Sequence, residues 1–252
     1  MSSESERALP RNDEPQWFTT THWSVVLAAR APSPEADRSL QMLCRAYWPP
    51  LYTFIRRRGH AEHDAQDLTQ EFIARLLAKD FLANISPQKG RFRSYLLAAL
   101  KNFLADEYHR ATAAKRGGGA PMIPLASDLE EQFLGAEPAT HTTPETDFER
   151  CWARALLERA VARLRGEWAD AGRAAKFERL KSYLEAEPEP GEYAAVAPDL
   201  KMSTGAVSVA VHRLRARFVE LVRQEIASTV AAPEEIDDEL RHLATVLGRR
   251  TA

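Results

Sequence analysis

Apolar residues recur at three- and four-residue spacing along most of the chain, and no sustained apolar/polar alternation predicts a sheet. A short helix is expected from Trp23, and a helical stripe from Leu40 to Ile55, with a bend at Pro49-Pro50 and an end near Gly59. Further helices are expected at about 64–78, 92–114, 147–168 and 173–185. The pattern therefore predicts an all-α protein.

The order of the segments predicts two small helical domains joined by a long acidic linker. A stretch interrupted by Gly and Pro is too long to be an internal loop of a compact domain. The predicted parts are a disordered N-terminus at 1–21, a first domain at 22–114, the linker at 115–146, a second domain at 147–230 and a C-terminal amphipathic helix at 231–252. The apolar stripe of that last helix needs an apolar partner, most simply the second domain. It comprises Ile236, Leu240, Leu243 and Leu247.

Composition narrows the class of protein. Hydrophobic residues make up 44% and charged residues 28%, which is typical of a globular protein. No apolar run approaches the length of about 20 residues that spans a bilayer, and the polar, acidic N-terminus lacks the pattern of a secretory signal. A soluble cytoplasmic protein is expected. Cys44 and Cys151 have no Cys or His at metal spacing, so neither a structural zinc nor another cofactor is predicted.

Charge is segregated along a chain whose net charge is only −2. The local balance is +5 from Lys89 to Arg116, −6 from Asp128 to Arg150 and +4 from Lys201 to Arg223. Two basic segments separated by an acidic one are consistent with two nucleic-acid contacts. On charge alone, solvated helix faces are the favoured interpretation.

Three segments carry candidate chemistry, and the first is acidic. Asp64, Asp67 and Glu71 are spaced three and four apart, so their carboxylates share one helix face. This face could dock a basic partner, or it could be a solvated helix whose early acids favour the helix dipole. With His60 and His63 added, a divalent-metal site is a third interpretation.

The second segment, RFRSYLLAALKNFLADEYHRATAAKR, interleaves aromatic and basic residues. Aromatic faces can stack on unpaired bases while the cations follow phosphates. We expect Phe92 and Phe103 to be core residues, which leaves Tyr95 and the preceding loop as stacking candidates.

The third segment predicts a helix-turn-helix. Tyr193, Val196 and Leu200 form the apolar side of a short helix, and Ser203 can cap a second, basic helix. A short helix, a tight turn and a basic second helix are typical of a motif that enters the major groove. An amphipathic hairpin with Arg for solubility is the alternative.

At these three segments the sequence resembles the extracytoplasmic-function (ECF) sigma factors of bacterial RNA polymerase, in order and in spacing. DAQDLTQEFIARLL is similar to the helix of region 2.2 that binds the largest polymerase subunit. The resemblance implies core-binding roles for Asp67, Gln70 and Glu71, with Asp64 extending the same face. It also implies that the 92–114 helix and the loop before it melt the minus-ten promoter element.

The resemblance implies two sets of DNA contacts. At the minus-ten element these are Arg91, Arg93, Tyr95, Lys101, Asn102 and Arg110. At the minus-thirty-five element they are Ser203, Thr204, Ser208, Val209, His212, Arg213 and Arg215. Lys201 stands where the family usually has Gly, in a left-handed turn that costs a side-chain-bearing residue about 1–2 kcal/mol.

The sequence thus favours a sigma factor, which is not an enzyme, acting as a monomer when free and binding core polymerase and promoter DNA. A dimeric helix-turn-helix regulator and a metal-dependent hydrolase are the alternatives. The promoter consensus and the inducing signal stay open. So does control by an anti-sigma factor, a regulatory kinase or the C-terminal helix.

Overall fold

The computed structural model describes residues 33–78, 91–116, 142–230 and 232–248, and every regular element in these ranges is a helix. This confirms the predicted all-α class. The α-helices are α2 (Pro34–Arg57), α3 (Glu62–Leu76), α5 (Phe92–Arg116), α7 (Pro144–Asp170), α8 (Ala174–Leu180), α9 (Glu192–Leu200), α10 (Thr204–Ala227) and α11 (Ile236–Gly248). The short 3₁₀ helices are η3 (Lys181–Leu184) and η4 (Pro233–Glu235).

Some predicted segments lie outside the described residues. They are the N-terminal segment 1–21, the short helix from Trp23, the loop before α5 and most of the predicted linker. Among the helices that are described, none is long and apolar enough to cross a membrane.

The first group of helices, α2, α3 and α5, packs around aromatic side chains. The rings of Tyr47 and Phe92 meet edge to face at 5.3 Å between centroids, and those of Phe72 and Phe103 lie 5.5 Å apart. Helix α2 continues through Pro49-Pro50 to Arg57. Each Pro removes only one helical N–H, and the buried residues on either side hold the two halves of α2 in one core. Gly59 follows in the left-handed region, at φ +90°, and ends the turn as predicted.

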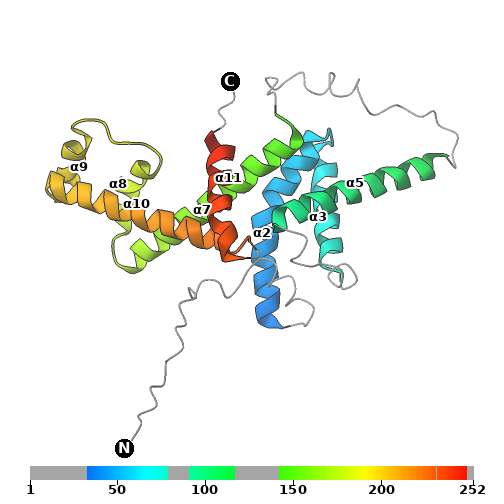
Figure 1. Ribbon diagram of the computed structural model, residues 1–252, viewed down its shortest axis with the longest axis horizontal. Helices are drawn as coiled ribbons and strands as arrows, with labels where there is room; N and C mark the ends of the chain where they lie inside the picture. The colour runs from blue at the N-terminus through cyan, green and yellow to red at the C-terminus, as the bar shows by residue number, and fades with distance from the viewer. Residues whose placement is uncertain (1–32, 79–90, 117–141, 231, 249–252) are drawn as a thin grey trace, which may run out of the picture.

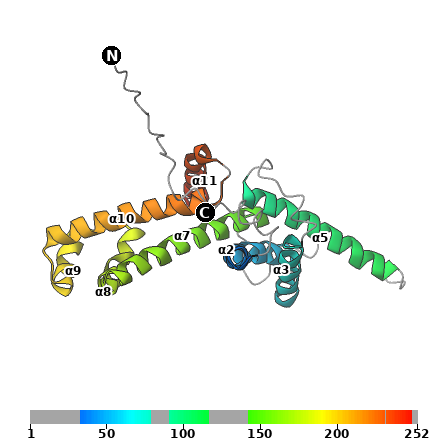
Figure 2. The same cartoon turned by 90° about the horizontal axis from the view of Figure 1, so that it is seen from below.

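Helix α7 joins this group to the rest of the chain. Its fully buried side chains recur every four residues, as Phe148, Trp152, Leu156, Ala160 and Leu164. One end of this stripe packs against α2 and the other against α10. Figures 1 and 2 show α7 and α10 crossing each other, with α2, α3 and α5 at one end and α8 and α9 at the other. The two predicted domains therefore share a continuous hydrophobic core.

The chain turns sharply between α9 and α10. Lys201 adopts the left-handed conformation at φ 52°, as the comparison with the family pattern predicted. Pro198 lies inside α9, which is only nine residues long. The Ser203 hydroxyl accepts a hydrogen bond from the Ala206 N–H at 3.2 Å, which confirms the predicted cap.

Helix α11 packs against α7 and α10, so its apolar stripe finds a partner within the chain. The buried positions are Ile236, Leu243 and Val246, together with the charged residue Glu239. Leu247 was expected on this stripe, but its side chain is 37% exposed. Four residues are slightly more than one helical turn, so Leu247 lies to one side of the surface that packs against α7 and α10. Val246, three residues after Leu243, is buried there instead.

Trp152 tests the importance of the shared core, because it is 1% exposed and is the largest side chain of the α7 stripe. Trp152→Ala should lower the free energy of unfolding by about 3–5 kcal/mol. The matched control is Trp48→Ala on α2, where the indole is 37% exposed and the loss should be much smaller. Urea denaturation followed by circular dichroism measures both. Equal losses would contradict a shared core at Trp152.

Candidate polymerase and nucleic-acid interface

The acidic side chains of α3 lie on the surface. Asp64, Asp67, Gln70 and Glu71 are all exposed, whereas the opposite side of the helix buries Phe72 and its neighbours. The periodicity of the sequence therefore predicted correctly which side of this helix faces solvent.

Two side chains contact this acidic face. The imidazole of His63 lies 3.1 Å from an Asp67 carboxylate oxygen. Arg75 bridges Glu71 and Glu107 of α5 at 2.9 Å each, and its guanidinium stacks over the Phe103 ring. The face is thus anchored to α5 and keeps Asp64 and Gln70 open to a partner.

The same residues were considered as metal ligands. Among the described residues, no group of three or more His, Cys, Asp or Glu side chains gathers as a metal site. The backbone carbonyl of His60 accepts a hydrogen bond from Arg56 at 2.7 Å, and burial lowers the pKa of the His60 imidazole.

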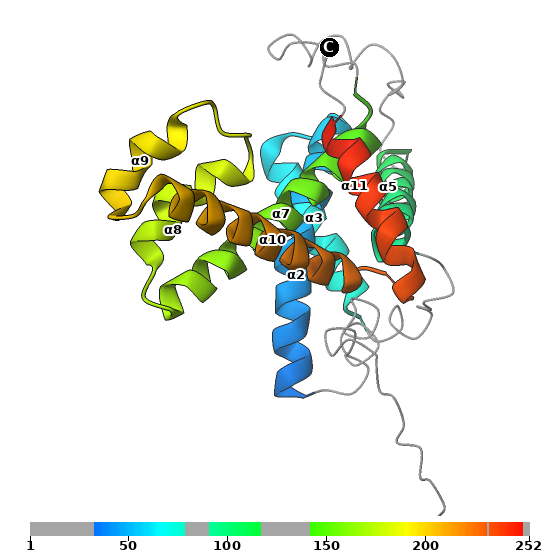
Figure 3. The ribbon, with the colours of Figure 1, turned by 60° about the vertical axis from the view of Figure 1, so that its left-hand side comes forward.

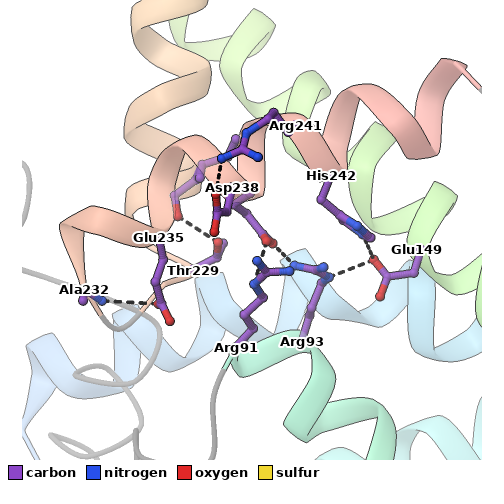
Figure 4. Close-up of polar contacts among 11 residues, drawn as sticks. Arg91, Arg93, Glu149, Thr229, Ala232, Glu235, Asp238, Arg241 and His242 are labelled. Carbon is purple, nitrogen blue, oxygen red and sulfur yellow. Dashed lines mark hydrogen bonds and ion pairs between the residues drawn. The ribbon is translucent and has the colours of Figure 1, made fainter.

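The basic start of α5 is covered by carboxylates from the second half of the chain. The Nε atom of Arg91 lies 3.0 Å from Glu239 of α11. Arg93 is 3% exposed, lies 2.8 Å from Glu149 of α7, contacts Glu239 and stacks over the Trp152 ring. Figure 4 shows Arg91 and Arg93 side by side, with Glu149 next to Arg93. Burial lowers the pKa of Arg93, and the neighbouring Glu149 carboxylate opposes that shift. The guanidinium remains charged, as Arg does in proteins, and the carboxylates compensate the buried charge.

The first turn of α7 continues this pairing. Glu145 lies 2.7 Å from Lys101 of α5, and Asp147 lies 2.5 Å from Arg57 of α2. The hydrogen bond from Lys101 lowers the pKa of Glu145. The acidic segment of the sequence therefore contacts the first basic segment directly. Glu149 and Glu239, which complete the contact, were missed by sequence reasoning.

The remaining minus-ten candidates are distributed along α5. Tyr95 is half-buried and packs against the core. Asn102 and Arg110 are exposed, and Arg110 lies 2.5 Å from Glu107. The C-terminal half of α5 projects beyond α3 (Figures 1 and 2). The structure therefore does not bring the six minus-ten candidates together on one open surface.

The candidates on α10 divide into two kinds. Thr204, Ser208, Val209, His212 and Arg213 are exposed, and Ser203 is exposed as well as forming the cap. Arg215 instead turns back into the protein. Its guanidinium donates to the backbone carbonyls of Tyr183 and Ala186 at 2.7 Å each.

A shallow hollow of about 430 Å³ lies beside the exposed face of α10. Apolar atoms of Trp168, Leu180 and Val209 line it, and so do the cationic side chains of Arg173, Lys176 and Arg213. The exposed face of α10 is therefore continuous with a basic, partly apolar surface.

Comparison with known proteins assigns the first group of helices. Residues 43–114 match the family model described as Sigma-70 region 2. The matched segment holds α3, α5 and most of α2, and it supports a sigma-70 family role in RNA polymerase binding and promoter recognition. Proteins of that family are in general not enzymes. No curated protein sequence and no solved structure matches the chain.

Arg215 and Arg213 give a matched pair for stability. Arg215→Ala removes two charge-assisted hydrogen bonds that hold the turn after η3 against α10, so it should cost about 1.5–3 kcal/mol of unfolding free energy. Arg213→Ala removes an exposed side chain and should cost less than about 0.5 kcal/mol. Urea denaturation compares the two, and equal costs would rule out the structural role of Arg215.

Proposed function

We propose that the chain is an ECF sigma factor that binds core RNA polymerase and directs promoter recognition, melting and initiation. The match of residues 43–114 to Sigma-70 region 2 carries this proposal. The proposed site of action is the cytoplasm. The direct test is to capture core polymerase with the purified chain, followed by runoff transcription on genomic fragments. Transcription that does not depend on the chain would contradict the proposal.

Docking on polymerase is assigned to the exposed acidic face of α3. Asp64, Asp67, Gln70 and Glu71 are presented to solvent by a helix whose other side is anchored in the core. A surface of this kind attracts a basic partner and steers its approach. Arg75 holds Glu71 in place, so this carboxylate meets the partner with little loss of side-chain freedom.

Promoter DNA is assigned to two regions. On this proposal α5 contacts the minus-ten element through Arg91, Arg93, Tyr95, Lys101, Asn102 and Arg110. Helices α9 and α10 act as a helix-turn-helix and contact the minus-thirty-five element. Within α10, the exposed residues Ser208, Val209 and His212 face the bases, and Arg213 faces a phosphate. Ser203 and Thr204, at the start of α10, contact the backbone. Arg215 contributes through the turn that it stabilises.

Reversal of the acidic face tests the docking role. The double variant Asp67→Lys, Glu71→Lys should weaken binding of core polymerase by at least about tenfold, because like charges brought together at an interface cost several kcal/mol. Folding should be unaffected, since both side chains are exposed. The control is Glu62→Lys, at the opposite side of the same helix from Glu71. A binding titration that gives unchanged affinity for the double variant refutes the docking role.

Two variants of α10 separate positioning from base recognition. Arg213→Ala should weaken binding to every promoter sequence and reduce the salt slope by about one unit. His212→Ala should alter the preference at one or two upstream base pairs by roughly 1–3 kcal/mol each. Selection of bound sequences from a randomised upstream element measures the base preference of each variant. If the His212→Ala chain recovers the parental consensus, His212 does not contact bases.

A further inference from the structure

The start of α5 is the most basic part of the proposed minus-ten surface, yet it is closed in the free chain. Arg91 and Arg93 both contact Glu239 of α11. Glu239 is 0% exposed and Arg93 is 3% exposed. While α11 is in place, a DNA phosphate cannot reach the Arg93 guanidinium.

The chemistry of the contact is that of a phosphate site. A guanidinium donates paired N–H groups to a carboxylate in the same way as to a phosphate. Glu239 forms ion pairs with Arg91 and Arg93 together, in the place that a backbone phosphate would take in a DNA complex. Figure 3 shows α11 beside α5, and Figure 4 shows Arg91 and Arg93 reaching from the start of α5 toward α11.

We propose that α11 is an autoinhibitory clasp, with Glu239 occupying the place of a DNA phosphate at the start of α5. The inference rests on the proposed function, because it needs α5 to be a DNA-binding helix. In the closed chain the clasp competes with promoter DNA. When it opens, Arg91 is free and Arg93 is held from the α7 side alone, by Glu149.

The construction of α11 is suited to opening. It is a helix of thirteen residues, and its buried apolar side chains are Ile236, Leu243 and Val246. Two further polar contacts join α11 to neighbouring helices. Asp237 pairs with Arg223 of α10 at 2.7 Å on the surface, where such pairs contribute little, and the His242 imidazole lies 2.9 Å from a Glu149 carboxylate oxygen of α7. An element with few buried contacts can open locally without unfolding the rest.

Two pairs of variants test the clasp. Glu239→Gln removes the competing charge, and Asp237→Asn removes one charge two residues earlier at an exposed position, so the change in net charge is the same. Leu243→Ala loosens α11 while leaving every charge in place, and Leu247→Ala is its control because Leu247 is exposed. The probe is a fluorescent oligo-dT strand of about 20 nucleotides, which is long enough to span the basic face. It is titrated in low salt with each full chain.

Glu239→Gln and Leu243→Ala should each bind the oligo-dT strand about tenfold more tightly than the parent, within the range usual for coupled equilibria. Asp237→Asn and Leu247→Ala should stay within about twofold of the parent. The amides of α11 should exchange with solvent faster in Glu239→Gln and Leu243→Ala than in Asp237→Asn and Leu247→Ala. The clasp is overturned if Glu239→Gln binds no more tightly than Asp237→Asn. Should Glu239→Gln fail to fold, the comparison of Leu243→Ala with Leu247→Ala decides.

Capture of core polymerase by the same chains separates the two possible failures. If the parent binds polymerase and the oligo-dT affinity does not respond to the variants, the clasp is wrong and the sigma-factor assignment stands. If no chain binds polymerase or DNA, the proposed function is wrong and the clasp falls with it.

Discussion

A guanidinium that is almost wholly buried must be surrounded by carboxylates, and the arrangement of the helices depends on meeting that requirement for Arg93. The carboxylates come from α7 and α11, so the pairing of one side chain brings together three helices that are distant in sequence. The Trp152 ring closes the remaining side of the guanidinium. Removing one partner from a buried pair typically costs about 3–5 kcal/mol. The arrangement is therefore specific, because any shift of α7 or α11 along α5 would leave a buried charge without its partner.

Helix α7 turns this local requirement into the architecture of the whole chain. Its first turn presents acids to α2 and α5, and its buried stripe then runs from the core of α2 to that of α10. Charge fixes the position of one end of α7, and apolar packing holds its full length. On the proposed function, the promoter surfaces of α5 and α10 are held in a set relation until α7 moves.

Periodicity was sufficient for the helices, because a helix is decided by neighbours three and four positions away. The Ser203 cap and the left-handed Lys201 are equally local, and the structure has both. The sequence near each residue carries no comparable signal for the pairings between helices. Arg93 and Arg215 both belong to basic segments, and nothing nearby in sequence distinguishes them from Arg213, which is exposed. Only the fold places Glu239 and the carbonyls of Tyr183 and Ala186 against them.

The near-neutral net charge has a structural meaning that the sum alone conceals. Basic segments able to follow phosphates would also bind any nucleic acid in reach, because that electrostatic attraction does not depend on sequence. In this chain the acids that balance the first basic segment are in contact with it, through Glu145, Glu149 and Glu239. Among the residues that the structure describes, no carboxylate covers the face of α10 that bears Arg213. The two proposed DNA surfaces therefore differ in availability. The α10 face, proposed to bind duplex DNA, is exposed among the described residues, whereas the α5 surface, proposed to bind melted DNA, is paired with the chain's own carboxylates. Such an order suits a protein that finds upstream duplex first and engages the melted strands afterwards.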